Sequence, residues 1–269
     1  MRVSIGHVTR YSYPQPALRL TQALRLTPPS FAGQRVIEWT IQSPGIDKAG
    51  KFRDGFGNQV HLVSLTAAHD EVLIIAKGVI ETLDTAGVVR GLSEPSPARV
   101  YLRATPQTRA GDNVAALAGP IGRAPGLEGL HELMRNVRDA VDYEVGTTHQ
   151  HTSAEEALAD GKGVCQDHAH VFIAAARHLG VPARYVNGYL YADSGQAAAA
   201  HHAWAEALVP QLGWVGFDPA NRVCPTDHYI RLATGLDAAS AAPIRGSRRG
   251  GAEEALDVTV QVQQHSVQQ

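Results

Sequence analysis

A cysteine between a glycine-rich turn and a predicted helix is the first candidate for chemistry. In the segment Gly161-Lys162-Gly163-Val164-Cys165-Gln166-Asp167, the helical pattern starts at about Cys165. The thiolate is the reactive form of cysteine, and the unpaired N–H groups at a helix start favour its negative charge. An ordinary buried cysteine is an equally good explanation of the segment when it is considered alone. Its position makes Cys165 a candidate nucleophile.

A histidine on a predicted strand is the candidate base. In the segment His201-His202-Ala203-Trp204-Ala205-Glu206, side chains alternate between two faces, so His202 shares a face with Trp204 and Glu206. A histidine beside a large aromatic side chain is partly shielded from water and can take up and return a proton. A pair of solvent-facing histidines is the more common explanation of such a segment alone. The shared face favours His202 over His201 as the base.

An aspartate at the end of the next predicted strand is the candidate partner of this histidine. A turn sequence at 210–213 joins the strand that ends at Asp218 to the strand that carries His202, which predicts a hairpin. A diagonal offset between the two residues is allowed, because the sequence does not determine the register. A carboxylate there holds the imidazole in one tautomer and stabilises its charged form. The alternatives are an Asp-Pro turn without a chemical role and Asn221 as the partner.

Periodicity predicts the elements that must position these residues. Apolar residues spaced by three or four predict a helix at about 127–141, and a capping-box pattern starts another helix at Ser153. The helix that begins at about Cys165 runs to Leu179, before a glycine and a proline that stop it. Three strands are expected to follow, at 184–191, 203–209 and 213–218.

The first hundred residues show strand patterns instead. Short runs of alternating apolar and polar residues with turn signals between them favour a sandwich-like β domain, with strands at about 3–7, 37–41, 60–65 and 72–76. Residues 85–112 have the composition of a linker, and residues 238–253 that of a loop. A last strand is expected at about 256–262. The predicted organisation is an N-terminal β domain at 1–100, a catalytic core at 101–235, and a loop with a C-terminal strand at 236–269.

Composition excludes several classes of protein. A net charge of −2 and a pI near 6.7 give no electrostatic support for nucleic-acid binding. No run of about 18 apolar residues predicts a membrane span, and the N-terminus has no signal-peptide pattern. Two cysteines exclude a disulfide framework, although a bridge between Cys165 and Cys224 stays open. We therefore expect a globular cytoplasmic protein without a nucleic-acid or membrane partner.

Several motifs together resemble a known family. The chain resembles the core of bacterial transglutaminase-like proteins in Gly-Val-Cys-Gln-Asp at 163–167, the segment 179–189, His-Ala-Trp at 202–204 and the segment 213–219. The first hundred residues resemble the β domain that precedes this core, through 19–20, 25–28 and Asp-Gly-Phe-Gly-Asn at 54–58. The resemblance therefore covers nearly the whole chain.

This resemblance implies an α+β protein in which a β-sandwich-like domain precedes a papain-like core, with the cysteine helix packed on an antiparallel sheet. It implies Cys165 as nucleophile, His202 as base and Asp218 as the residue that orients the base. Two positions depart from the family pattern. Ala220 stands where Thr is usual, and Leu236 stands where Arg is common, which bears on substrate contacts in that loop.

The resemblance also implies acyl transfer. Cys165 would attack a glutamine-type carboxamide, release ammonia and form a thioester that an amine or water resolves. Hydrolysis of peptide or isopeptide bonds by the same residues is the alternative, and a non-catalytic binding module on the same fold is a second. The expected partner is a protein or peptide substrate, and the sequence does not predict the oligomeric state. The candidates for substrate contact are Trp204, Gln166 and Tyr189.

A metal site is a further alternative, because the sequence offers a cysteine and several histidines close together: Cys165, His168, His170, His201 and His202. Their spacing lacks the paired ligands of a closed zinc site. No acidic loop has the pattern that surrounds calcium with oxygen atoms. We therefore expect no metal and no cofactor.

Overall fold

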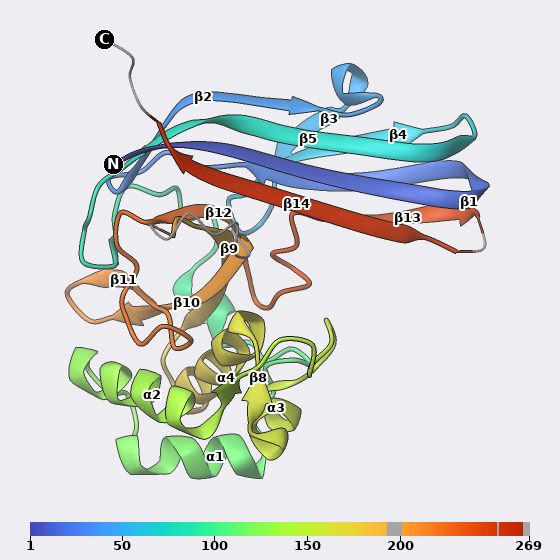
Figure 1. The fold of residues 1–269 in the computed structure, drawn as a ribbon. Helices are drawn as coiled ribbons and strands as arrows, with labels where there is room; N and C mark the ends of the chain where they lie inside the picture. Colours follow the sequence, from blue (N-terminus) through green and yellow to red (C-terminus); the bar gives the residue numbers. More distant parts are fainter. Residues whose placement is uncertain (193–200, 252, 266–269) are drawn as a thin grey trace.

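The computed structural model describes residues 1–192, 201–251 and 253–265 of the chain. The fold is α+β, as the sequence predicts, with two curled antiparallel sheets and a group of helices. Figure 1 shows the larger sheet at one end of the molecule, the helices at the other, and the smaller sheet between them. In the part of the chain that is described, no helix is long and apolar enough to cross a membrane.

The strand β1 (Arg2–Thr27) runs through the middle of the larger sheet. Its first half pairs on one side with β5 (His69–Thr82) and on the other with β14 (Ala255–Gln264). Its second half pairs in the same way with β4 (Gln59–Leu65) and β13 (Ile244–Gly250). All four ladders are antiparallel. Together they give β1 a partner on both sides along most of its length.

The larger sheet turns back on itself. Beyond β5 lies β2 (Gln34–Gln42), and beyond β4 lies β3 (Gly50–Arg53). The segment that separates β2 from β3 lies beside the turn that separates β4 from β5. In β1 the register shifts between Ser12 and Ala17, where two prolines cannot donate to a ladder. Figure 1 shows β1 reversing its direction at the end of the larger sheet that lies away from the N-terminus. The two halves form the layers of a β-sandwich, which confirms the sandwich-like domain.

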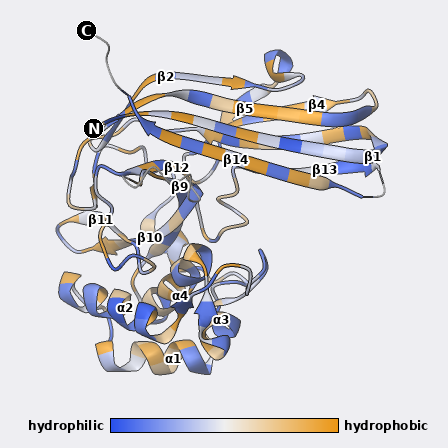
Figure 2. Ribbon diagram, viewed as in Figure 1, coloured by the Kyte–Doolittle hydropathy of each residue, from blue (hydrophilic) through white to orange (hydrophobic). Residues whose placement is uncertain are grey.

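Both layers of the sandwich share one hydrophobic core. Ile5 and Leu24, from the two halves of β1, belong to it, and Figure 2 shows hydrophobic and hydrophilic residues alternating along these strands. The same core continues onto Tyr189, Ile230 and Leu232 of the smaller sheet. The two sheets therefore pack against each other.

The smaller sheet carries His202, and Asp218 follows immediately after one of its strands. Its strands are all antiparallel and follow the order β12 (Tyr229–Gly235), β9 (Ala183–Leu190), β10 (His201–Val209), β11 (Gly213–Phe217) and β6 (Val88–Val89).

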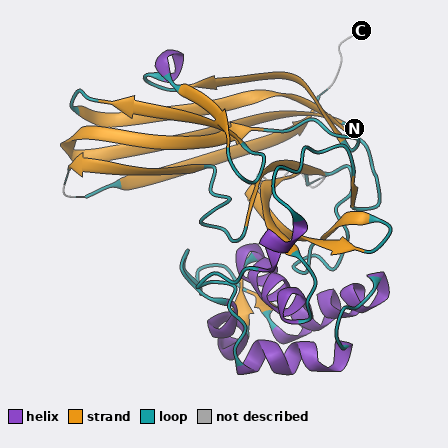
Figure 3. Ribbon diagram, turned by 180° about the vertical axis from the view of Figure 1, so that it is seen from behind, coloured by secondary structure: helices purple, strands orange, loops and turns teal. Residues whose placement is uncertain are grey.

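The helix α4 (Cys165–His178) lies against this sheet, and nearly all of its residues are buried. Ala203, Ala205 and Ala207 of β10 belong to the same core as α4, and their small side chains let the helix approach the sheet closely. The other helices surround α4 (Figure 3). They are α1 (Asp112–Ala118), α2 (Leu127–Ala140) and α3 (Ala154–Asp160), with the 3₁₀ turns η1 (Ile46–Lys48), η2 (Ala98–Leu102) and η3 (Gly119–Ile121) elsewhere in the chain.

The structure confirms most of the predicted core elements and corrects others. The helix at 127–141, the capping box at Ser153 and the helix from Cys165 are present. The loop predicted at 238–253 is wrong, because β13 occupies part of it and pairs with β1. The segment 85–112 includes β6, which pairs with β11, so part of it belongs to the smaller sheet.

Two side-chain amides of the sandwich bind the outer edge of β12. Gln34 donates from Nε2 to the carbonyl oxygen of Arg231 (2.9 Å), and its Oε1 accepts the N–H of the same residue (2.8 Å). Asn58 makes the same pair of bonds with Thr234, at 2.8 and 2.9 Å. Each amide makes the backbone bonds that a neighbouring strand would make, so these bonds attach the sandwich to the smaller sheet.

Candidate active site

Cys165 is the first residue of α4, and its side chain is partly exposed. Gly161 ends α3 with a left-handed φ of 65°. At Gly163, a Cβ atom would lie 2.7 Å from the Cβ of Asp167, so a larger residue does not fit there. Asp167 in turn accepts the N–H of Val164 at 2.8 Å and caps the helix. These features start α4 at the cysteine, at the positive end of the helix dipole.

His202 lies near the start of β10 and is almost buried, with 8% of its side chain exposed. Its Nε2 is 2.7 Å from Oδ2 of Asp218. In the hairpin of β10 and β11, Ala205 pairs with Phe217, so Asp218 lies opposite Trp204 and reaches His202 diagonally. The predicted hairpin and the allowed offset are both present.

Asp218 is fully buried, and several donors surround its carboxylate. Oδ2 accepts hydrogen bonds at 2.7 Å from His202, from Nδ2 of Asn221 and from the hydroxyl of Tyr229. Burial by itself raises the pKa of a carboxyl group. The bonds and charge of His202, with the bonds from Tyr229 and Asn221, outweigh burial and hold the pKa of Asp218 below its usual range.

The charge on Asp218 determines the protonation of His202. Burial lowers the pKa of this imidazole, but hydrogen bonds and charges from Asp218 and Cys165 outweigh it and raise the pKa to about 10. His202 is therefore an imidazolium at neutral pH. Because Nε2 binds Asp218, Nδ1 is the nitrogen that remains to face Cys165. This geometry places a protonated imidazole beside the sulfur of Cys165.

Asn221, the rival partner of the histidine, lies beside the same group. Its Nδ2 is 3.5 Å from Nε2 of His202 and 2.7 Å from Oδ2 of Asp218. The shorter contact with the imidazole is therefore made by Asp218, and Asn221 donates to the carboxylate.

The three residues proposed to contact substrate lie in different environments. Trp204 is buried and stacks beside His202, with ring centroids 6.4 Å apart and planes inclined by 25°. Gln166 follows Cys165 and is partly exposed. Tyr189 is fully buried, and its hydroxyl is 2.9 Å from Nδ1 of His7. Tyr189 pairs with His201, so it lies on the face of the sheet opposite to His202. The structure does not bring it together with the other two.

Two tyrosines near the site were not identified from the sequence. Tyr229 of β12 donates to Asp218 and meets the ring of His202 edge-on at 5.8 Å. Tyr143, on the short strand β7 (Asp142–Tyr143), pairs with Gly163 of β8 (Lys162–Gly163) and is 44% exposed. Burial is the largest effect that raises the pKa of Tyr143, followed by the charges of Cys165 and Asp218. Tyr143 therefore lies near Cys165 and Asp218.

The histidines considered as metal ligands are otherwise engaged. Both ring nitrogens of His168 lie within 2.9 Å of backbone carbonyl oxygens. His170 accepts the N–H of Ala238 at 3.0 Å, and burial, the largest effect on it, lowers its pKa to about 4. Within the described residues, no three His, Cys, Asp or Glu side chains are grouped as a metal site would require.

Known proteins resemble the chain along nearly its whole length. The sequence model described as "Transglutaminase-like superfamily" matches residues 115–219, and that described as "Bacterial transglutaminase-like N-terminal region" matches residues 3–81. An uncharacterized protein of Mycobacterium leprae is 31% identical over 283 residues, which cover 97% of this chain and 98% of the relative. An uncharacterized protein of Mycobacterium tuberculosis is 29% identical over 293 residues, covering 97% and 92%.

Two further matches are shorter or more distant. A protein-glutamine gamma-glutamyltransferase of Pseudomonas aeruginosa is 34% identical over 86 residues, or 29% of this chain and 12% of the relative. A proposed cysteine protease of Cytophaga hutchinsonii has a crystal structure that superposes with a TM-score of 0.74 at 21% identity, covering 100% of this chain and 92% of that one. This structure shares the fold. Because the two sequence models match the sandwich and the core in order, and the Mycobacterium leprae relative extends over nearly the whole chain, the protein belongs to the transglutaminase-like superfamily.

Proposed function

We propose that the protein is a cysteine acyltransferase that forms a thioester with a glutamine-type carboxamide and passes the acyl group to an amine or to water. The observation that carries the proposal is the hydrogen bond between Asp218 and His202, with Cys165 at the start of α4 near enough to raise the pKa of His202. In this arrangement Asp218 is ionised and His202 is protonated, as the orienting residue and the proton donor require.

In the first half of the reaction, the thiolate of Cys165 attacks the carbonyl carbon of the carboxamide. The N–H groups of Asp167 and His168 already donate to Val164, so those of Cys165 and Gln166 are the ones at the helix start that can bind the oxyanion that forms. His202 gives its proton to the nitrogen as the C–N bond breaks, so ammonia leaves and an acyl thioester remains.

In the second half, neutral His202 removes a proton from the incoming amine or water as it attacks the thioester. The C–S bond breaks, and Cys165 leaves as a thiolate beside the imidazolium. An amine gives a new amide, and water gives a carboxylate. Asp218 stays ionised throughout and keeps the imidazole oriented.

Transfer and hydrolysis share these steps and differ only in the second nucleophile. The name of the Pseudomonas aeruginosa relative supports a glutamine acyl donor, and its match covers less than a third of this chain. We therefore propose a protein or peptide substrate, with peptide or isopeptide hydrolysis as the alternative outcome. Both cysteines are free thiols, which supports the proposed cytoplasmic location.

Ammonia release from small glutamine amides, with and without an added amine, tests this proposal. We expect release that depends on Cys165 and an amide product when amine is present. Release with only a carboxylate product would indicate hydrolysis. No release, with a peptide bond cleaved instead, would indicate a peptidase, and a fully inert protein would indicate a binding module.

A further inference from the structure

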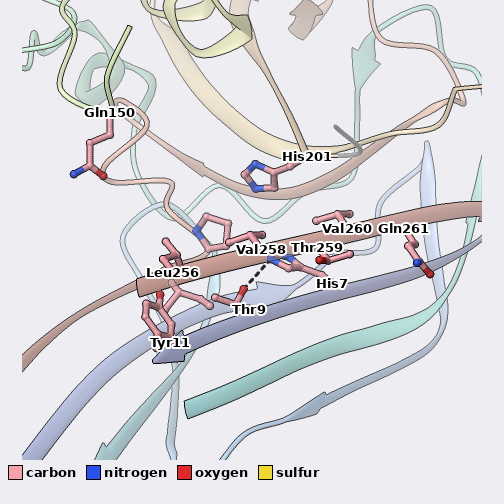
Figure 4. Close-up of a pocket in the computed structure, with 12 residues that line it drawn as sticks. His7, Thr9, Tyr11, Gln150, His201, Leu256, Val258, Thr259, Val260 and Gln261 are labelled. Atoms are coloured by element: carbon pink, nitrogen blue, oxygen red, sulfur yellow. Dashed lines mark hydrogen bonds between the residues drawn. The ribbon is translucent and has the colours of Figure 1, made fainter. Parts of the chain in front are cut away.

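A cavity of about 690 Å³ lies between the sandwich and the start of β10. Figure 4 shows β14 along one side of this cavity and His201 and Gln150 across from it. Leu256 and Val258 of β14 line it and are 56% and 48% exposed. Its volume lies within the range of about 300–1,000 Å³ typical of ligand pockets.

The lining of the cavity is uncharged. Among the described residues that line it, none is Asp, Glu, Lys or Arg. Burial, with a smaller effect of a neighbouring histidine, lowers the pKa of His7 to about 3 and that of His201 to about 4. Both imidazoles are therefore neutral at physiological pH. An uncharged, largely apolar segment fits this lining, whereas a charged side chain would lose hydration without gaining a partner.

The strand β14 offers backbone hydrogen bonds at the cavity. In the described part of the chain it pairs with β1 alone, so its other edge has no strand partner. An unpaired edge presents N–H and C=O groups to which an extended peptide can add as a further strand.

Two segments that line the cavity are neighbours in sequence of the reactive residues. His201 immediately precedes His202, although its side chain lies on the opposite face of the sheet. On the other side, Gln150 follows His149, whose carbonyl oxygen accepts a bond of 3.4 Å from Nε2 of Gln166, the residue after Cys165. The cavity therefore adjoins the segment that contacts the residue after Cys165.

We propose that this cavity, with the outer edge of β14, is a groove that binds the substrate polypeptide as an extended strand and selects uncharged, apolar-rich segments. The inference rests on the proposed function, because it specifies the substrate of the same Cys165 site. The groove adds affinity for residues that flank the reactive glutamine and does not contribute to the bond-breaking steps.

Two synthetic peptides of equal length test the selection. Each has one glutamine, flanked on both sides by Val, Leu and Thr in the first peptide and by Glu and Lys in the second. We expect the apolar peptide to exceed the charged one in kcat/KM by about tenfold or more. The apolar peptide can also be methylated on every second backbone nitrogen, which gives two versions. One of the two versions should lose this advantage, because its methylated nitrogens are those that would donate to β14.

A pair of variants on β14 provides the matched control. Val258→Lys places a charge in the groove, and Gln263→Lys places the same charge on the same strand at an exposed position outside the lining. Val258→Lys should remove the preference for the apolar peptide, with turnover of an unflanked glutamine amide within about twofold of wild type. Gln263→Lys should keep the preference.

Binding of the fluorescently labelled apolar peptide to the Cys165→Ala protein, followed by anisotropy, separates this inference from the proposed function. Binding that Val258→Lys weakens supports the groove even if no glutamine amide is turned over. Equal binding of the two peptides would overturn the groove and leave the proposed function intact. A wild-type dimer that Val258→Lys dissociates, without any peptide preference, would also overturn it by showing that β14 pairs with a second copy.

Discussion

The carboxylate of Asp218 determines the electrostatics of the site, because every short contact to its Oδ2 is a donor. Without them, a fully buried carboxyl group would take up a proton and leave the imidazole without its partner charge. Tyr229 and Asn221 donate to this oxygen at 2.7 Å, from outside the three reactive positions. The protonation of His202 beside Cys165 therefore depends on residues outside the three reactive positions.

Selective labelling tests the position of the reactive thiol. Cys165 lies at a helix start beside an imidazolium, whereas burial raises the pKa of Cys224 to about 11. Iodoacetamide at mildly acidic pH should therefore modify Cys165 much faster, as measured by peptide mapping over time. Cys165→Ser provides the control for labelling of Cys224. Similar rates at the two cysteines would contradict the assignment.

The two adjacent histidines should respond very differently to substitution. His202 contacts Asp218 and Cys165, whereas His201 points to His7 on the other face, with ring centroids 5.9 Å apart. On a small glutamine amide, His202→Ala should be nearly inactive and His201→Ala should stay within a few-fold of wild type. Initial rates of ammonia release measure both variants. Loss of activity in His201→Ala alone would refute the assignment of the base.

Asp218→Asn should reduce turnover by about 10²-fold or more with little change in melting temperature. The amide keeps the size of the side chain but removes the charge that stabilises the imidazolium. A cysteine enzyme should lose less than the roughly 10⁴-fold that the same change costs a serine protease, because the thiolate persists beside its base. Near-normal turnover in Asp218→Asn, with loss in Asn221→Ala, would instead identify Asn221 as the orienting residue.

The same variant should change the pH dependence. The folded pKa of His202 is raised, so its contribution to stability is complete below about pH 6.5 and is lost as the pH rises through about 10. The alkaline limb of kcat/KM should therefore lie near pH 10 in the wild type. In Asp218→Asn it should move to lower pH, because the charge that holds the proton is absent. An unchanged limb would assign it to another group.

At the scale of elements, the sequence predicted those helices and strands of the core that have a clear local pattern of apolar and polar residues. The helix α4 and the hairpin of β10 and β11 have clear periodicity and turn signals, and these positioned Cys165, His202 and Asp218. The strand β12 was missed because it carries Arg231, which is buried where it binds Glu206 at 3.0 Å. Its partner Glu206 comes from another strand, so no local pattern could indicate this pair.

Long-range pairing caused the other errors. The strand β13 has the sequence Ile-Arg-Gly-Ser-Arg-Arg-Gly, which is typical of a loop, and it is a strand because β1 lies beside it. Tyr229 was missed for a related reason. It reaches Asp218 only because β12 adds to the far edge of β9, and nothing near Tyr229 in the sequence indicates that neighbour.

Asn58→Leu should weaken the attachment of the sandwich to the smaller sheet. The substitution removes two bonds to Thr234 and leaves its buried N–H and C=O without partners. We expect a loss of about 2–5 kcal/mol in unfolding free energy, measured by urea denaturation. Asn113→Leu, at an exposed position of α1, is the control and should change it by less than about 0.5 kcal/mol. Equal effects of the two substitutions would show that the bonds contribute nothing.

At the scale of the whole molecule, we expect activity without calcium. The most acidic stretch of the C-terminal part includes Glu253, Glu254 and Asp257, and Glu254 already pairs with Arg248 at 3.5 Å. Such a site supplies fewer oxygen ligands than the six to eight that calcium takes. Turnover should therefore be the same after dialysis against a chelator. Loss of activity that calcium restores, and magnesium does not, would disprove this.

The pairing of β1 with β13 and β14 also bears on how the protein folds during synthesis. Residues 2–27 are synthesised well before residues 244–264, and one side of β1 receives its partner only when the later segment has been made. Until then a long strand edge is open, and the core sheet lacks a finished sandwich to pack against. Contacts this far apart in sequence make folding slow and expose the nascent chain to aggregation. The N-terminal domain therefore completes its fold only after translation has reached the C-terminal strands.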